Sequence, residues 1–217
     1  MMEDAVRAGS LDAILWDLDG TLIDSEPLHE WAFVQTLKSL DLEVPPGFHE
    51  RVIGHSEHQC YVWLSEMVDV PLPYDQWVAR RYSFYLDNVS RLLPIPPSLA
   101  LWDEFARQGI AQAIVSNSDR RIVNANMRHL GFDPDKVPSV SRSEVSAGKP
   151  RPEPYLAGAE RMGVSPARTA VVEDSATGIA SGVAAGMVVF TVTDALVGKD
   201  GVRPLTALQP AHFAKAA

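Results

Sequence analysis

The sequence predicts an α/β fold, in which a parallel sheet with flanking helices is interrupted by one helical insertion. Short apolar runs alternate with segments of helical periodicity over most of the chain. Several of these runs end in acidic or hydroxyl residues, where strands of an open parallel sheet meet a ligand crevice. Residues 25–92 contain helical patterns and no convincing strand. With 217 residues and 46% hydrophobic composition, the chain can form one large domain or a core with a smaller second part.

The first predicted strand, residues 11–17, leads directly into a pair of carboxylates. Ile14, Leu15 and Trp16 precede Asp17, and Asp19 follows one residue later, before a glycine. Two carboxylates this close repel each other, and burying each one unpaired costs several kcal/mol. A hard divalent cation such as Mg²⁺ takes oxygen ligands and removes that cost. The alternative is a solvated turn with acidic residues beside a helix N-terminus.

The insertion is expected to consist of helices separated by proline and glycine breaks. Ser25 is a favourable N-cap residue and Pro27 suits the first helical turn. The spacing of apolar residues predicts helices at about 25–40, 57–68 and 74–89.

After the insertion, the chain alternates between helices and strands. We expect helices at about 98–108, 119–130, 154–162 and 175–186, strands at 110–115, 138–140, 169–174 and 187–192, and a short final helix after residue 201. Asp174 ends one of these strands as Asp17 ends the first. Adjacent strands would bring the two acids within a few ångströms and complete a metal site.

Two further residues have types suited to binding an anion. Ser116 closes strand 110–115 just before a helix start, where a hydroxyl and backbone N–H groups can donate to phosphate. Its alternative role is an ordinary N-cap. Lys149 lies in a segment framed by prolines, which fix the backbone and hold the lysine stem. A fixed ammonium would offset the charge of the carboxylates and a phosphate, whereas most lysines simply face solvent.

Taken together and in order, these segments resemble the four motifs of the haloacid dehalogenase (HAD) superfamily, in its C1-capped phosphatase and phosphomutase-like branch. The matching residues are Asp17-Leu-Asp-Gly-Thr21, Ser116, Gly148-Lys149-Pro150 and Glu173-Asp174-Ser175. The resemblance implies a Rossmann-like parallel sheet core, residues 1–24 and 93–217, with an inserted helical C1 cap, residues 25–92. It favours a mobile cap over helices that pack as an ordinary part of one domain.

The resemblance also implies a Mg²⁺-dependent phosphatase that hydrolyses a small phosphorylated metabolite, with a sugar phosphate as the expected class. Asp17 would be the nucleophile that forms an aspartyl-phosphate, and Asp19 the general acid and base. Mg²⁺ would bind Asp17, the backbone carbonyl of Asp19, and Asp174. Glu173 would not bind the ion directly but would reach a metal-bound water. The residues implied for the phosphoryl oxygens are Thr21, Ser116, Asn117 and Lys149.

Two other functions compete with this one. A sugar phosphomutase of the β-phosphoglucomutase type shares all four motifs, and residues 53–58 match a cap loop of both branches. Glu57, however, stands where an arginine is expected in a mutase. His55 and His58 of this loop are candidates for substrate contact. A non-catalytic binding protein on the same fold is the other possibility, and the intact acids at 17, 19 and 174 weigh against it.

Charge and composition exclude several partner classes. The formal net charge of −9 argues against nucleic acid, which needs a basic surface. No segment approaches the roughly 20 apolar residues of a membrane span. A single cysteine, Cys60, permits no intrachain disulfide and fits a reducing compartment. We expect a cytoplasmic protein, and the sequence carries no signal of its oligomeric state.

Overall fold

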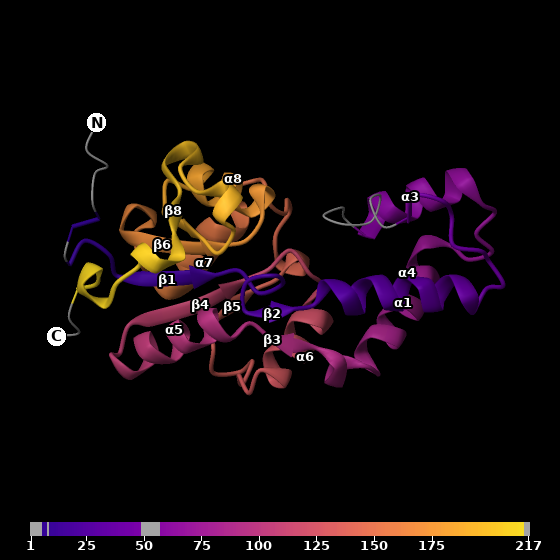
Figure 1. Ribbon diagram of the computed structural model, residues 1–217, viewed down its shortest axis with the longest axis horizontal. Coiled ribbons are helices and arrows are strands. Elements are labelled where there is room, and N and C mark those ends of the chain that lie inside the picture. Colours follow the sequence, from indigo (N-terminus) through magenta and orange to yellow (C-terminus); the bar gives the residue numbers. More distant parts are fainter. Residues whose placement is uncertain (1–5, 8, 49–56, 215–217) are drawn as a thin grey trace. The chain divides into compact units, whose positions relative to one another are not determined.

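The apolar run before Asp17 forms β1 (Ala13–Trp16), an inner strand of a six-stranded parallel sheet (Figure 1). The computed structural model describes residues 6–7, 9–48 and 57–214. The strand order is β5-β4-β1-β6-β7-β8. The other strands are β4 (Ala111–Val115), β5 (Ser139–Val140), β6 (Thr169–Glu173), β7 (Val188–Thr191) and β8 (Arg203–Pro204). The predicted α/β fold with a parallel sheet is confirmed.

The register of the three central strands fixes where their ends meet. Trp16 of β1 lies beside Ile114 of β4 and Val172 of β6. All three strands run in the same direction, so their carboxyl ends share one edge of the sheet. Residues that follow β1, β4 and β6 are therefore brought together although about 150 residues of sequence separate the first from the last.

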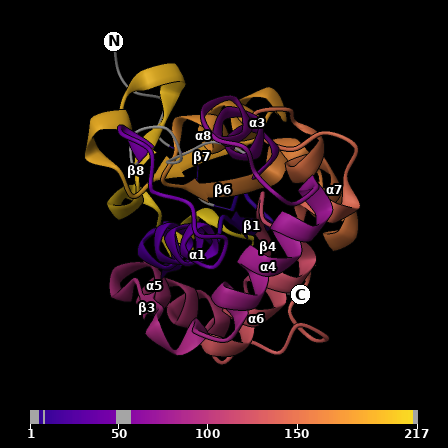
Figure 2. The same ribbon diagram turned by 90° about the vertical axis from the view of Figure 1, so that its right-hand side faces the viewer.

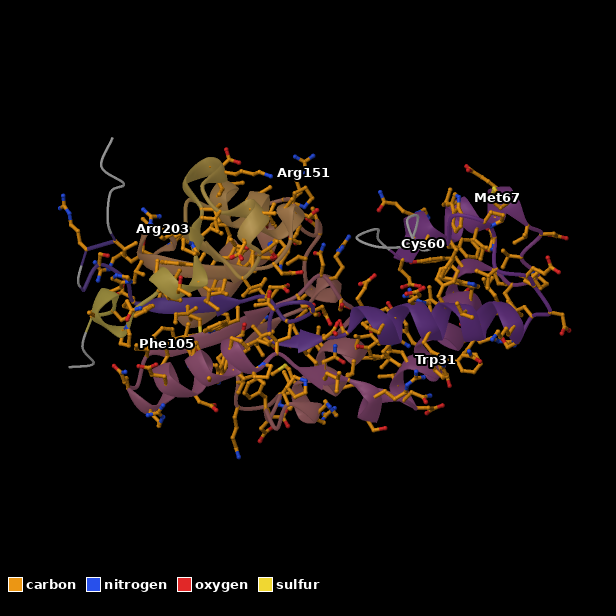
Figure 3. All side chains as sticks on the ribbon, viewed as in Figure 1. Trp31, Cys60, Met67, Phe105, Arg151 and Arg203 are labelled. Atoms are coloured by element: carbon orange, nitrogen blue, oxygen red, sulfur yellow. The ribbon has the colours of Figure 1, made fainter. Side chains whose placement is uncertain are left out.

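Helices cover both faces of this sheet, as two views show (Figures 1 and 2). One face carries α7 (Glu153–Met162) and α8 (Ala176–Ala184), and the other carries α5 (Pro96–Arg107) and α6 (Arg120–His129). Because side chains alternate along a strand, neighbouring residues of β1 enter different cores. Leu15 packs in the cluster that contains Tyr155 of α7, whereas the Trp16 ring contacts Phe105 of α5, labelled in Figure 3.

The helical insertion forms a separate unit with its own core. By contacts, the chain divides into Met1–Asp24 with Pro94–Ala217, and Ser25–Leu93. The second unit contains α1 (Glu26–Lys38), α3 (Glu57–Met67) and α4 (Tyr74–Leu86). Two short strands, β2 (Ile23–Asp24) and β3 (Leu93–Pro94), pair where the chain leaves and re-enters the sheet unit. The predicted helical insert is confirmed.

Aromatic side chains fill the core of the insertion. The Phe33 and Trp77 rings lie 5.0 Å apart at an angle of 73°, an edge-to-face arrangement. Cys60 of α3 is buried in the same core (Figure 3), and burial raises the pKa of its thiol to about 11. This is the environment of a structural cysteine and not of a reactive one.

The tail after residue 201 differs from its prediction. Instead of a short final helix it contributes β8, two residues that pair in parallel with β7, followed by short 3₁₀ turns. Two residues cannot show a strand period, so only pairing with an existing sheet edge defines this element. In the insertion, α4 ends at Leu86, three residues before the predicted end. Among the described residues, no helix combines the length and apolar character that crossing a membrane requires.

Gly182 of α8 should be needed for packing. An added Cβ would lie 2.9 Å from Val189 Cγ2 and 3.2 Å from Val171 Cγ1. Glycine to alanine in a helix normally stabilises by about 1 kcal/mol, but overpacking a core costs about 1–3 kcal/mol. We therefore expect Gly182→Ala to lower the urea midpoint, whereas Thr177→Ala, exposed on the same helix, should not. A more stable Gly182→Ala protein would contradict this packing.

Candidate active site

A buried ammonium lies between the ends of the three central strands. Lys149 Nζ donates to Asp17 Oδ1 (2.7 Å), the Val115 carbonyl (2.8 Å) and Glu173 Oε1 (2.6 Å). These three acceptors follow or end β1, β4 and β6, and they use all three N–H groups of the lysine. The Lys149 side chain is only 3% exposed. The alternative of a solvent-facing lysine is therefore excluded.

Asn117 holds the backbone of Lys149 in place. Its Nδ2 donates to the Lys149 carbonyl (3.2 Å), and its Oδ1 accepts from the Lys149 N–H (2.9 Å). Gly148 allows this approach, because a Cβ there would lie 2.6 Å from Asn117 Oδ1. Asn117 was predicted to contact phosphate, but its side-chain amide is engaged with the lysine segment.

Three carboxylates cluster beside the ammonium. Oxygen atoms of Asp17, Glu173 and Asp174 lie within 4.8 Å of one another. Asp17 Oδ2 is buried and has no hydrogen-bond partner among the described residues. A buried carboxylate oxygen without a donor is costly, and a hard cation bound by carboxylates would satisfy it. These carboxylate oxygens therefore fit the ligands of a divalent cation.

Two residues from the first motif fit closely around Asp174. Thr21 Oγ1, which was predicted to contact phosphate, donates to Asp174 Oδ1 over 3.4 Å and is fully buried. Gly20 has a φ of +87°, and a Cβ there would lie 2.3 Å from Asp174 Oδ2. Glycine is required on both counts, because of its left-handed backbone and because of the nearby carboxylate.

Burial controls the protonation of this cluster. Burial raises the pKa of Asp17 well above its ordinary value; Lys149 opposes the rise, and the charges of Glu173 and Asp174 add to it. Burial and then Glu173 raise the pKa of Asp174 to about 6. Burial alone would lower the pKa of Lys149, but the charges of Asp17 and Glu173 outweigh it and raise that pKa. The single positive charge of Lys149 thus cannot neutralise the three carboxylates of Asp17, Glu173 and Asp174.

Glu173 is held more firmly than the sequence indicated. It is fully buried, and Oε1 accepts from Lys149 and from the Tyr155 hydroxyl (2.8 Å), while Oε2 accepts from Ser175 Oγ (3.1 Å). A Cβ at Gly178 would lie 1.7 Å from Glu173 Oε1. Burial and the Glu173 charge raise the pKa of Tyr155 well above its ordinary value, so its hydroxyl remains a donor. Sequence reasoning missed Tyr155, although it lies on the helix just after the Lys149 segment.

The Asp19 side chain lies in a separate group of polar side chains. Oδ2 accepts from Ser116 Oγ and Ser118 Oγ, both at 2.9 Å, and Oδ1 accepts from Asn126 Nδ2 at 2.9 Å. Ser116, predicted to face phosphate, therefore contacts Asp19. Ser118 and Asn126 were not found from the sequence. A signal existed for Asn126, a polar residue on the face of its helix that also carries Ile122 and Val123.

Part of the predicted cap loop lies outside the described residues. Residues 53–56, which include His55, are not among the residues that the structure describes. Glu57 begins α3 and forms an ion pair with Arg81 of α4. The His58 ring packs against Tyr74, with ring centroids 5.2 Å apart.

Comparison with known proteins identifies the family. The model of the haloacid dehalogenase-like hydrolases matches residues 11–186. Hexitol phosphatase A of Escherichia coli is 31% identical over 82% of this chain and 81% of its own. A phosphorylated carbohydrates phosphatase of Thermotoga maritima is 28% identical over 82% of both chains. Among solved structures, a CbbY variant of Rhodobacter sphaeroides in complex with xylulose 1,5-bisphosphate superposes with a TM-score of 0.79 at 22% identity, covering 92% of this chain and 99% of that one.

The chain therefore belongs to the haloacid dehalogenase-like hydrolases, in their C1-capped phosphatase and phosphomutase-like branch. The predicted resemblance and enzyme class are confirmed, and the chain has the helical insert that is typical of the C1 cap in this family.

The raised pKa of Asp174 predicts how stability should change with pH when a chelator keeps cations away. Asp174 would ionise near its ordinary pKa of 3.8 in the unfolded chain but near 6 in the folded protein. The folded state then holds more protons, so this group lowers stability as pH rises between about 4 and 6. Asp174→Asn removes that loss, and should stabilise the protein at pH 8 by on the order of 3 kcal/mol.

Urea unfolding in EDTA at pH 4 and pH 8 measures the effect. The advantage of Asp174→Asn should shrink at pH 4, where the aspartate is protonated in the folded state and about half protonated in the unfolded chain. Asp103→Asn, exposed on α5, is the control and should show neither effect. If Asp174→Asn were less stable than the wild type at pH 8, the raised pKa of Asp174 in the folded protein would be contradicted.

Proposed function

We propose that this protein is a Mg²⁺-dependent phosphatase that hydrolyses a small phosphorylated metabolite, a sugar phosphate, through an aspartyl-phosphate at Asp17. Asp17, directly after β1, has one oxygen on the Lys149 ammonium, while its other oxygen is buried beside Glu173 and Asp174 without a donor among the described residues. That second oxygen is the one available for a cation and for phosphorus.

The reaction divides into two displacements at phosphorus. In the first, an Asp17 oxygen bonds to phosphorus and the ester P–O bond breaks, while Asp19 gives its proton to the leaving oxygen. In the second, Asp19 takes a proton from water, the water oxygen bonds to phosphorus, and the Asp17–phosphorus bond breaks. Asp17 returns to its starting form and inorganic phosphate is released.

The cation site would consist of Asp17, the backbone carbonyl of Asp19, and Asp174. When bound, Mg²⁺ supplies positive charge that offsets the repulsion between these carboxylates and a phosphate. Glu173 is already paired with Lys149 and Tyr155, so its role is to hold the ammonium beside Asp17.

The phosphoryl oxygens would meet Thr21, Ser116, Asn117 and Lys149. The three N–H groups of Lys149 are taken by protein acceptors, so its contribution is chiefly the electrostatic effect of a buried charge. Ser116 would exchange its hydrogen bond to Asp19 for one to phosphate. Asn117 would contribute its backbone N–H, because its side chain holds Lys149.

The substrate class rests on the relatives. Two of them are named for phosphorylated carbohydrates and for hexitol phosphates. The mutase alternative has less support, because Glu57 occupies the position where a mutase is expected to have arginine, and it is paired with Arg81 inside the cap. The proposed reaction therefore releases phosphate to water and does not return it to the sugar.

Phosphate release tests this function directly. With p-nitrophenyl phosphate and with a panel of sugar phosphates, we expect turnover in Mg²⁺ and its loss in EDTA. Asp17→Asn should abolish turnover, by at least about 10³-fold, because the nucleophile is removed. Asp103→Asn is the matched control and should retain full activity.

An active Asp17→Asn enzyme would contradict the assigned nucleophile, and activity that resists EDTA would contradict the metal site. If a sugar phosphate were isomerised without release of inorganic phosphate, the enzyme would be a mutase.

A further inference from the structure

Asn126 is an unusual residue for the face of α6 that it occupies. It is completely buried, and its helix neighbours Ile122, Val123 and Met127 are buried apolar residues. Leaving a buried amide without a partner costs about 1–3 kcal/mol, so a polar residue here indicates a specific hydrogen bond. The structure provides it, since Nδ2 donates to Asp19 Oδ1 at 2.9 Å.

The carboxylate of Asp19 is held from two sides. Ser116 and Ser118, which follow β4, donate to Oδ2, and Asn126 donates to Oδ1 from the second turn of α6. Ser116 Oγ also accepts from the Ser118 N–H at 3.0 Å, which fixes the serine relative to this loop. The two oxygens of Asp19 are therefore distinguished, one by hydroxyls and the other by a buried amide.

The hydroxyl of Ser116 has only one proton to donate. If Ser116 turns that proton to a phosphoryl oxygen, as the proposed function requires, Oδ2 of Asp19 loses a donor. The donor to Oδ1 is a different group, the Asn126 amide, and does not depend on that change. Oδ1 then stays anchored while Oδ2 becomes available to the leaving oxygen and the attacking water.

We propose that Asn126 is the positioning residue of Asp19: it anchors Oδ1 so that Oδ2 performs the proton transfers. This inference rests on the proposed function, since it assumes that Asp19 is the acid and base. Loss of orientation of a catalytic group costs on the order of 10- to 100-fold in rate.

To test this proposal, the amide of Asn126 is replaced with an apolar group of similar size. With p-nitrophenyl phosphate and Mg²⁺, Asn126→Leu should lower kcat by about 10- to 100-fold and leave KM within about twofold. Met127→Leu, a similar-volume change at the next buried position of α6, should leave kcat unchanged. An unchanged kcat in Asn126→Leu, or a change confined to KM, would overturn the proposal.

Acid quenching during turnover provides a readout that structural damage would not move. The p-nitrophenolate group leaves without needing a proton, whereas the water step needs the base. Asn126→Leu should therefore increase the fraction of folded enzyme trapped as aspartyl-phosphate. An unchanged fraction alongside a lower rate would mean that the variant only disturbs folding. If Asn126→Leu does not fold, the smaller Asn126→Ala, which also lacks the donor, should show the same trapping.

A thermal-unfolding cycle separates this inference from the proposed function. Without substrate or metal, the effects of Asn126→Leu and Asp19→Ala on the free energy of unfolding should not add, because each removes the same hydrogen bond. Additive effects would show that the contact is absent and overturn the proposal. Suppose instead that the effects are non-additive but the wild-type protein shows no Mg²⁺-dependent turnover. The contact between Asn126 and Asp19 would then be supported, and both the phosphatase function and the positioning role would be rejected.

Discussion

The arrangement of this site depends on the ion pairs of one buried lysine. Lys149 places its ammonium where β1, β4 and β6 end, and its donors join a nucleophile candidate, a backbone carbonyl and a buried glutamate. A buried charge is tolerated when its partners are close and its hydrogen bonds are complete, and here both conditions hold. The parallel register makes this possible, because it aligns the ends of three strands that are remote in sequence.

The same ammonium leaves the site short of positive charge. Asp17, Glu173 and Asp174 lie together, and the pKa values of Asp17 and Asp174 are both raised. The fold then uses two means of accommodating the carboxylates. Hydroxyl and amide donors hold Glu173 and Asp19, while glycines at positions 20 and 178 leave room for Asp174 and Glu173. The remaining negative charge, around Asp17 Oδ2, is the feature that a divalent cation would complement.

Much of this could be predicted from the sequence, because the central features are local. A buried strand that ends in acids can be recognised within a few residues, as at Asp17 and Asp174, and prolines mark the segment of Lys149. The parallel sheet and the helical insert follow from periodicity. The partners of the side chains could not be predicted. Asn117 turned to the Lys149 backbone and Ser116 to Asp19, and both choices depend on loops that meet only in the folded protein. Tyr155, Asn126 and the two-residue strand β8 are likewise defined by distant neighbours.

The ammonium of Lys149 balances Asp17 and Glu173, and the free energy of unfolding reports this balance. Measured in EDTA at pH 8, Lys149→Met should destabilise the protein by about 3–5 kcal/mol, the cost of breaking a buried pair. Glu173→Gln should destabilise the wild type, because the lysine loses a partner, yet stabilise the Lys149→Met protein, because one uncompensated charge is removed. The effect of Glu173→Gln on the free energy of unfolding should therefore reverse its sign between the two backgrounds. If Glu173→Gln had the same effect in both backgrounds, the ion pair would not be the interaction that organises the site.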